Sequence, residues 1–151
     1  MTIAIVGRCA KTNMSGVAIT TSSIAVGSRC PYALAGAGAV TTQNVTDPTI
    51  GPAVLALMAK GHNAETAIKM AMDGRPHADF RQVAAVDLNG GTGVFTGHEI
   101  LGNNAVNQGK DCVGAGNLLS RVEVIPAMTK AFEDGYDLHL AERLTRALIR
   151  F

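Results

Sequence analysis

The sequence predicts one α/β (α+β) domain over residues 1–151, with mainly antiparallel sheets covered by helices. Residues 3–7 and 83–86 are apolar at odd and even positions alike, which is typical of strands buried on both faces. Residues 64–72 and 140–151 repeat apolar side chains every three or four positions, as amphipathic helices do. Burial on both faces suits a strand of a sheet that lies between a second sheet and a layer of helices.

The composition excludes several classes of function. The chain has 151 residues, enough for one domain with a buried core, and 47% of them are hydrophobic. No apolar stretch approaches the roughly 18 residues of a membrane helix, so we expect a soluble protein with no membrane partner. The net charge is +1 and the basic residues are scattered, which argues against a nucleic-acid partner.

Cysteine, histidine and glycine spacing predicts no disulfide, metal or cofactor. The three cysteines form no C-x-x-C pair, and the N-terminus lacks the layout of a signal peptide. We therefore expect a cytoplasmic protein with reduced thiols. None of the four histidines stands at metal-ligand spacing from another. After Gly36 and Gly38, Thr41 replaces the third glycine of a dinucleotide-binding loop.

The first 23 residues are predicted to form a hairpin that begins at Thr2. A polar turn at 11–16 separates the apolar run from a second strand at 17–23. If Met1 is removed, Thr2 carries a hydroxyl beside a free α-amine, whose reference pKa of about 7.7 to 8.0 leaves a neutral fraction at pH 7. Because such an amine can act as a base, Thr2 is the candidate nucleophile. The alternative is that Thr2 is the ordinary first residue of a strand.

Turn and capping residues divide the rest of the chain. The further predicted strands are 39–42, 81–88 and 92–96, the last two joined by the hairpin turn Asn89-Gly90-Gly91. The further predicted helices are 51–60, 63–72 with Asn63 as its cap, and two that begin near residues 120 and 137. Gly36 and Gly38 permit a close backbone approach before the strand at 39–42.

The second half of the chain offers three more expectations. Residues 102–109 are polar and predicted to be a loop. Ser120 and Glu123 have capping-box spacing, with Glu123 itself as the alternative helix start. Asp137 can cap the last helix, whose apolar face leaves three arginines largely off it: Arg143, Arg146 and Arg150.

Two polar residues are candidates to act with Thr2. Arg29 follows the second strand and could tune the nucleophile or bind a substrate carboxylate; the alternative is a structural arginine. Asn117 follows a run of small residues and could hold an oxyanion together with backbone N–H groups; the alternative is a turn residue.

Four residues are candidate substrate contacts: Ser23, Asn44, Asp47 and His98. Asn44 and Asp47 lie in a polar loop after a predicted strand, where ligand contacts are common, although turn and capping roles are the alternative. His98 follows another predicted strand, and a surface role is its alternative.

Five segments together resemble a known family. They are residues 2–8, 22–31, 36–43, 81–83 and 116–119. The chain resembles the DUF1028 family, a domain of unknown function, and the N-terminal nucleophile (Ntn) hydrolases more broadly. This resemblance implies a four-layer αββα sandwich in which Thr2 attacks, Ser22 or Arg29 orients it, and Asn117 holds the oxyanion. The implied activity is that of an amidohydrolase cleaving a C–N bond in a small amide or cyclic amide.

Departures from the Ntn pattern keep a second hypothesis open. Ser22 stands where the proteasome-like branch has an aspartate, and no lysine occurs between Lys11 and Lys60. The alternative is a non-catalytic binding or structural subunit with the same fold. Family members continue beyond the equivalent of Phe151, so the alternatives are a short member of the family or a protein with a missing C-terminal piece, for which a separate C-terminal chain is a candidate partner. Ala- and Met-rich helix surfaces predict a homo-oligomer, and a small molecule is the expected substrate.

Overall fold

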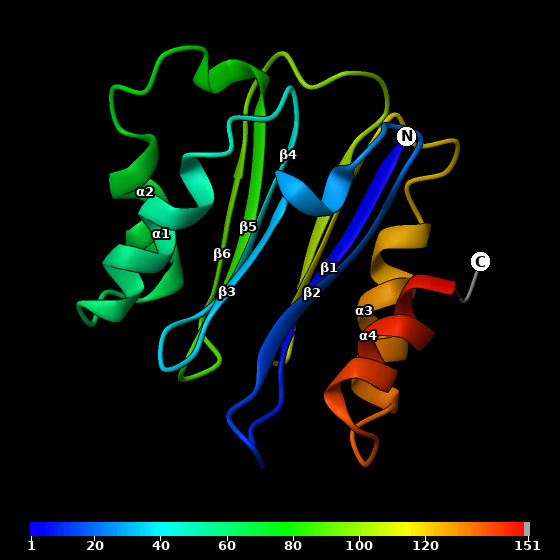
Figure 1. Ribbon diagram of the computed structural model, residues 1–151. Helices are drawn as coiled ribbons and strands as arrows, with labels where there is room; N and C mark the ends of the chain where they lie inside the picture. Colours follow the sequence, from blue (N-terminus) through cyan, green and yellow to red (C-terminus); the bar gives the residue numbers. More distant parts are fainter. Residues whose placement is uncertain (150–151) are drawn as a thin grey trace.

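The computed structural model describes residues 1–149 and is drawn in Figure 1. Two four-stranded sheets lie face to face, and a pair of helices covers the outer face of each sheet. All paired strands within the sheets run antiparallel. The predicted α+β class and its antiparallel sheets are therefore confirmed.

The first sheet has the strand order β2-β1-β8-β7. Its strands are β1 (Thr2–Arg8), β2 (Ser15–Thr21), β7 (Ala105–Gly109) and β8 (Cys112–Asn117). β1 lies inside this sheet, and its residues 3–7 are buried. The predicted N-terminal hairpin is confirmed, with Thr2 at the start of an interior strand.

The second sheet has the strand order β3-β4-β5-β6. Its strands are β3 (Pro31–Leu34), β4 (Gly38–Asn44), β5 (Arg81–Asp87) and β6 (Thr92–Thr96). Residues 83–86 are fully buried, as their unbroken apolar run predicted. The predicted strand at 39–42 and the hairpin at 81–96 are confirmed, whereas β3 was not predicted.

Four α-helices form the outer layers of residues 1–149. They are α1 (Ile50–Ala59), α2 (Ala64–Met72), α3 (Val124–Asp134) and α4 (Leu140–Ile149). α1 and α2 pack on the second sheet, and α3 and α4 pack on the first (Figure 1). Asn63 caps α2 as predicted, since its Oδ1 accepts the N–H of Thr66 at 2.8 Å. Within the described part of the chain, no helix has both the length and the apolar character to cross a membrane.

Side-chain alternation divides the core into three parts. In β1, Ile3 and Ile5 pack under α3 and α4, whereas Val6 faces the second sheet. The part between the sheets is built from small apolar residues: Val6, Ala39, Ala84, Val86, Val113 and Ala115. At the end where Thr2 lies, the strand positions that continue this inner face become polar.

Close packing requires glycine at two positions near β3 and β4. A Cβ on Gly38 would lie 2.1 Å from the carbonyl oxygen of Val86, and the φ angle of Gly38 is +144°. The predicted close backbone approach is thus confirmed for Gly38, whereas a Cβ on Gly36 would meet no atom within 4 Å. A Cβ on Gly51 would lie 2.1 Å from the ring of Tyr32, because α1 packs directly on β3.

The predicted loop at 102–109 is wrong in its second half, which forms the edge strand β7. The polar residues of an edge strand can serve packing, as Asn107 does by donating from Nδ2 to Thr129 Oγ1 of α3 at 2.5 Å. The small residues before Asn117 form β8. A Cβ on Gly114 would lie 3.0 Å from Met128 Cε, so these glycines let α3 approach the sheet.

The side-chain caps predicted for the last two helices are wrong. α3 begins directly after Glu123, the alternative start, without a capping side chain. The Asp137 carboxylate pairs with Lys11 Nζ at 3.0 Å instead of capping α4. Near the start of α4, His139 Nδ1 accepts the N–H of Ala141 at 3.3 Å.

Arg143 is buried, contrary to its predicted place off the apolar face. It is 4% exposed, and its Nε donates to the carbonyl oxygen of Phe132 at 3.2 Å. Its aliphatic stem and its contact with an aromatic ring make this burial possible. Arg146 is exposed as predicted. Arg150, like the predicted core residue Phe151, lies outside the described residues.

Candidate active site

A row of three polar residues crosses the first sheet at the start of β1. Thr2 pairs with Thr21 on one side and with Asn117 on the other. Thr2 has the strand parity of Val6, and Asn117 has that of Val113 and Ala115, so this row faces the second sheet. Thr2 is partly exposed, whereas Asn117 is 2% exposed. The row therefore leads from the surface into the interior.

A second polar row crosses the facing sheet. Gln82 of β5 pairs with Gln43 on one side and with Thr96 on the other. Gln82 has the parity of Ala84 and Val86, which places this row on the inner face of the sheet. Gln43 and Gln82 are almost completely buried. Each sheet thus presents polar side chains to the other at one end of the layer between them.

Hydrogen bonds join the two rows. Gln82 Nε2 donates to the carbonyl oxygen of Gly116 at 3.2 Å, which crosses from β5 to β8. Gln82 Oε1 accepts from Asn117 Nδ2 at 3.2 Å and from Gln43 Nε2 at 2.9 Å. Asn117 is therefore held in place by a buried amide, and the second hydrogen of its Nδ2 remains available to another acceptor.

Three buried polar atoms on the inner faces, in these rows or beside them, have no partner among residues 1–149. They are Gln43 Oε1, Thr41 Oγ1 and Thr96 Oγ1. Thr42 Oγ1 and Arg81 Nε, on the opposite faces of β4 and β5, also lack a partner in this part of the chain. Thr41 shares the parity of Gln43 on β4. Most buried polar atoms in proteins are hydrogen-bonded, so unpaired atoms grouped at one end of a layer need an explanation.

The hydroxyl of Thr2 bonds to its neighbour in β2. Thr2 Oγ1 and Thr21 Oγ1 lie 2.9 Å apart. Thr21 Oγ1 also accepts the N–H of Ser23 at 3.2 Å. These contacts place the Thr2 hydroxyl on the inner face, in the row that contains Asn117.

Ser22 lies beside the residue that precedes Thr2. Its Oγ accepts from the Met1 amino group at 3.3 Å, and its N–H donates to the Met1 carbonyl oxygen at 3.2 Å. Ser22 and Ser23 are both exposed. The structure thus brings these two serines to the edge of the Thr2 site, with Ser23 engaged through its backbone.

Arg29 has contacts within its own loop. Its Nη1 donates to the carbonyl oxygen of Ile24 at 2.5 Å, and its own carbonyl oxygen accepts from Tyr32 Oη at 3.2 Å. These two hydrogen bonds fit the alternative of a structural arginine, because they hold the loop between β2 and β3 together. A role toward Thr2 stays a prediction.

Asn44 and Asp47 make structural contacts. Asn44 has φ +76°, donates to the carbonyl oxygen of Phe80 at 2.7 Å and accepts the N–H of Leu101 at 3.2 Å. Asp47 accepts from Thr49 Oγ1 at 2.6 Å and pairs with Arg75 at 3.0 Å. The Thr49 hydroxyl and the Arg75 cation lower the pKa of Asp47 below its usual value. Both residues tie loops together at the Thr2 end of the sandwich.

His98 lies exposed in the loop after β6, without a side-chain hydrogen bond to residues 1–149. The same described part of the chain contains no group of three histidine, cysteine or carboxylate side chains arranged to hold a metal.

Apolar side chains surround the Thr2 end of the sandwich. Several exposed large hydrophobic residues precede β1 or follow β2, β4, β6 and β8 at this end: Met1, Ile24, Val45, Leu101 and Leu118. Ile24 is 91% exposed. The loops that border the polar rows thus expose these apolar side chains beside polar ones such as Ser22, Ser23 and His98.

Four members of the two rows were not predicted as site residues: Gln43, Gln82, Thr21 and Thr96. A signal for the glutamines was present, because each is a polar residue inside a strand otherwise suited to burial on both faces. A buried amide needs polar partners, so two such residues in different strands indicate a network. The register that joins them is set by contacts far apart in the sequence.

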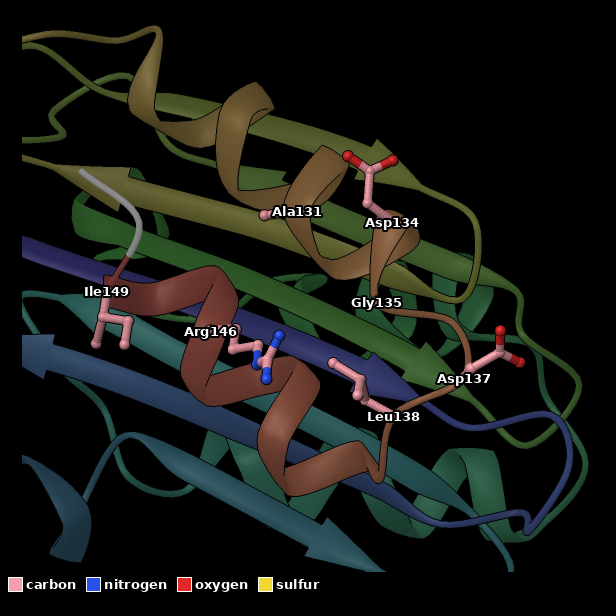
Figure 2. A pocket seen from close by; sticks show the side chains of 7 residues that line it. All are labelled: Ala131, Asp134, Gly135, Asp137, Leu138, Arg146 and Ile149. Carbon is pink, nitrogen blue, oxygen red and sulfur yellow. The ribbon is translucent and has the colours of Figure 1, made fainter.

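A cavity of about 670 Å³ lies elsewhere, between α3 and α4 (Figure 2). Its charged lining residues are Asp134, Asp137 and Arg146. Each already has a partner: Asp134 pairs with Lys130, Asp137 with Lys11, and Arg146 with Glu142. The cavity is on the outer side of the first sheet, so it is separate from the inner face on which Thr2 lies.

The sequence model of the Family of unknown function (DUF1028) matches residues 2–150. The chain belongs to this family. A crystal structure of a protein of the same family from Silicibacter pomeroyi is 30% identical, with a TM-score of 0.92. The similarity covers 98% of this chain and 68% of that one. The comparison with curated proteins found no match.

Proposed function

We propose that this protein is an amidohydrolase of the Ntn type, with Thr2 as nucleophile. Its four layers would then be an Ntn-hydrolase-like sandwich. The observation that carries the proposal is the row formed by Thr2 and Asn117, which lies where an interior strand begins at the polar end of the layer between the sheets. The substrate is a small amide or cyclic amide.

The first half of the reaction forms an ester. After removal of Met1, the α-amine of Thr2 takes the proton of its own hydroxyl, and Oγ1 attacks the carbonyl carbon. The free N–H of Asn117 Nδ2 and nearby backbone N–H groups stabilise the negative oxygen. The C–N bond then breaks, and the departing nitrogen takes the proton from the α-amine.

The second half regenerates the enzyme. Water attacks the ester carbonyl while the α-amine takes one of its protons. The acid leaves, and the proton returns to Thr2 Oγ1. The proton transfers of both halves therefore involve only the substrate, one water molecule, and the amine and hydroxyl of Thr2.

Removal of Met1 also frees the two groups of Ser22 that bond to it. The hydroxyl and N–H of Ser22, at 3.3 and 3.2 Å from Met1 atoms, lose their partners when Met1 leaves. Ser22 is then a candidate to orient the new amino terminus. This proposal supplies a role for Ser22 without requiring the aspartate of the proteasome-like branch.

Hydrolysis of propionamide and 2-piperidone tests the proposal. We expect activity in wild type with Met1 removed, little activity in Thr2→Ala, and retained activity in Thr2→Ser, which keeps a hydroxyl. Thr20→Ala is the matched control, because Thr20 is an exposed residue of the same hairpin. Hydrolysis by Thr2→Ala at the wild-type rate would contradict a nucleophilic role for Thr2.

A non-catalytic subunit is the second candidate function. It is favoured by Arg29, whose guanidinium bonds to Ile24 rather than to Thr2. Intact mass distinguishes the two candidates. Retention of Met1 in purified protein supports the subunit, whereas loss of Met1 and a covalent β-lactone adduct on Thr2 support the hydrolase.

A further inference from the structure

We propose that Gln43 selects a substrate with an N–H adjacent to its scissile carbonyl, and that Gln43 Oε1 accepts this N–H. The substrate class is therefore a primary amide, a secondary amide or a lactam. This inference rests on the proposed function for the position of the scissile carbonyl beside Thr2.

The hydrogen-bond network fixes the orientation of the Gln43 amide. Gln82 must present Nε2 to the carbonyl oxygen of Gly116, because a carbonyl only accepts. Gln82 Oε1 therefore points toward Gln43 and Asn117, and each of these must present its NH2 group. The orientation of one amide thus sets the other two. Gln43 Oε1 is left as an acceptor without a donor.

The sheets bring Gln43 to the same end of the sandwich as Thr2. β4 packs across from β1 and β2, the strands that carry Thr2 and Thr21. Gln43 lies on the inner face of β4 at the same end of the sandwich, next to the last residue of the strand. Asn117 and Gln43 both bond to Gln82 Oε1, so the proposed oxyanion donor and the unpaired acceptor belong to one network.

An amide substrate matches these two groups. Its carbonyl oxygen requires a donor, which Asn117 Nδ2 supplies, and its N–H requires an acceptor, which Gln43 Oε1 supplies. An unpaired buried acceptor is unfavourable, so a ligand N–H that reaches it gains more than a bond formed at the surface. A ketone or ester of the same shape lacks this donor.

The side chains of the two rows carry no charge. Their members are Thr2, Thr21, Asn117, Gln43, Gln82 and Thr96. Arg81 adjoins Gln82 but has the opposite parity, and its guanidinium bonds to the carbonyl oxygen of Val45. A cationic substrate group placed between the rows would lose its hydration without gaining an opposite charge. The rows therefore disfavour cationic ligands.

Binding to the Thr2→Ala variant tests this selection without turnover. 2-Piperidone and cyclohexanone share ring size and carbonyl, and differ in that an N–H replaces a CH2 group. We expect 2-piperidone to bind about five- to tenfold more tightly, as measured by NMR titration of the protein amides. We also expect pentanamide to bind about tenfold more tightly than 4-aminobutanamide, which has the same length and a positive charge.

Gln43→Met in the Thr2→Ala background removes the acceptor while keeping the side-chain length. We expect the preference for 2-piperidone over cyclohexanone to disappear. Gln108→Met in the same background is the matched control, because Gln108 is an exposed residue of β7. This control should prefer 2-piperidone over cyclohexanone as strongly as the Thr2→Ala parent does. Thermal unfolding checks the fold. We expect it to persist, because methionine fills the same space and Gln82 Oε1 keeps Asn117 Nδ2 as a donor when it loses Gln43 Nε2.

The outcomes separate this inference from the proposed function. Equal binding of both ring compounds to the parent, or a preference that survives Gln43→Met, overturns the inference even if wild type hydrolyses amides. A Gln43-dependent preference in a protein that hydrolyses nothing supports the binding selection and overturns the hydrolase. If Gln43→Met does not fold, the Gln43 side-chain NH2 signal decides, because it should shift with 2-piperidone and stay unchanged with cyclohexanone.

Discussion

The guanidinium of Arg143 lies 3.8 Å from the centre of the Phe132 ring, in the core between the first sheet and its helices. Within residues 1–149, Arg143 forms no ion pair with a carboxylate. It bonds instead to the Phe132 carbonyl oxygen and to the π face of the same residue. A cation–π contact shielded from water contributes up to about 2 kcal/mol.

Arg143→Ala is expected to lower the free energy of unfolding by about 3 kcal/mol, because it removes the ring contact, one hydrogen bond and a buried aliphatic stem. Arg143→Met keeps the stem and should cost less. Arg146→Ala is the control on the same helix and should change stability by no more than about 0.5 kcal/mol. Urea unfolding measures all three, and equal effects of the two alanine variants would show that Arg143 has no special role.

Gly38→Ala should destabilise the protein by about 3 kcal/mol, because its Cβ would lie 2.1 Å from the Val86 carbonyl oxygen and β4 would have to move. The φ of +144° adds strain. Gly27→Ala is the matched control, since no atom lies within 4 Å of its Cβ position. Thermal unfolding measures both, and an unchanged midpoint for Gly38→Ala would contradict this packing.

The sequence predicts elements well where the apolar pattern is local. The runs at 3–7 and 83–86 identified β1 and β5 because burial on both faces leaves no polar position. β8 escaped prediction because Gly114 and Gly116, which make room for Met128 and Ile125, have the composition of a loop. The burial of Arg143 was also not predicted, because the periodicity of one helix does not show that an aromatic ring of the neighbouring helix, Phe132, contacts this side chain.

The residues of the candidate site were likewise predicted where the signal is local and missed where it depends on distant contacts. Thr2 and Asn117 could be proposed as site residues from the sequence, because each stands at the end of a recognisable segment. That they are neighbours depends on the pairing of β1 with β8, which is more than 100 residues later in the chain. Gln43 and Gln82 were missed because the contact between the two sheets, which makes them part of one network, is not encoded in any local pattern.

Asp47→Asn should destabilise the protein at neutral pH and lose this effect in acid. Hydrogen bonds from Thr49 and the Arg75 cation lower the pKa of Asp47 below its unfolded value of about 3.9. A depressed carboxyl pKa stabilises the folded state above the unfolded pKa, and this stabilisation disappears as pH falls through the folded pKa. We expect a loss of about 1 kcal/mol at pH 7.

Urea unfolding at pH 7 and pH 3 measures this effect. The gap between wild type and Asp47→Asn should narrow at the lower pH. Asp134→Asn is the control, because its carboxylate forms an exposed pair with Lys130 and should contribute little at either pH. A gap that is equal at both pH values would contradict ionisation of Asp47 as the cause.

The cysteines should differ in reactivity. A hydrogen bond from the Thr12 side chain lowers the pKa of the Cys9 thiol, whereas burial raises the pKa of Cys112 to about 12. Since the thiolate is the reactive form, Cys9 should be alkylated before Cys112 in the native protein at pH 8. Peptide mass spectrometry with iodoacetamide measures the order.

Thr12→Val tests the cause of the difference between the thiols. It removes the hydroxyl that bonds to Cys9 and should slow Cys9 alkylation at pH 8, while Cys112, fully buried in β8, should react only as fast as the native structure opens. Added urea should therefore accelerate Cys112 much more than Cys9. Alkylation of both thiols at one rate in native wild type would mean that a common opening of the core, rather than the Thr12 hydroxyl, controls access to Cys9.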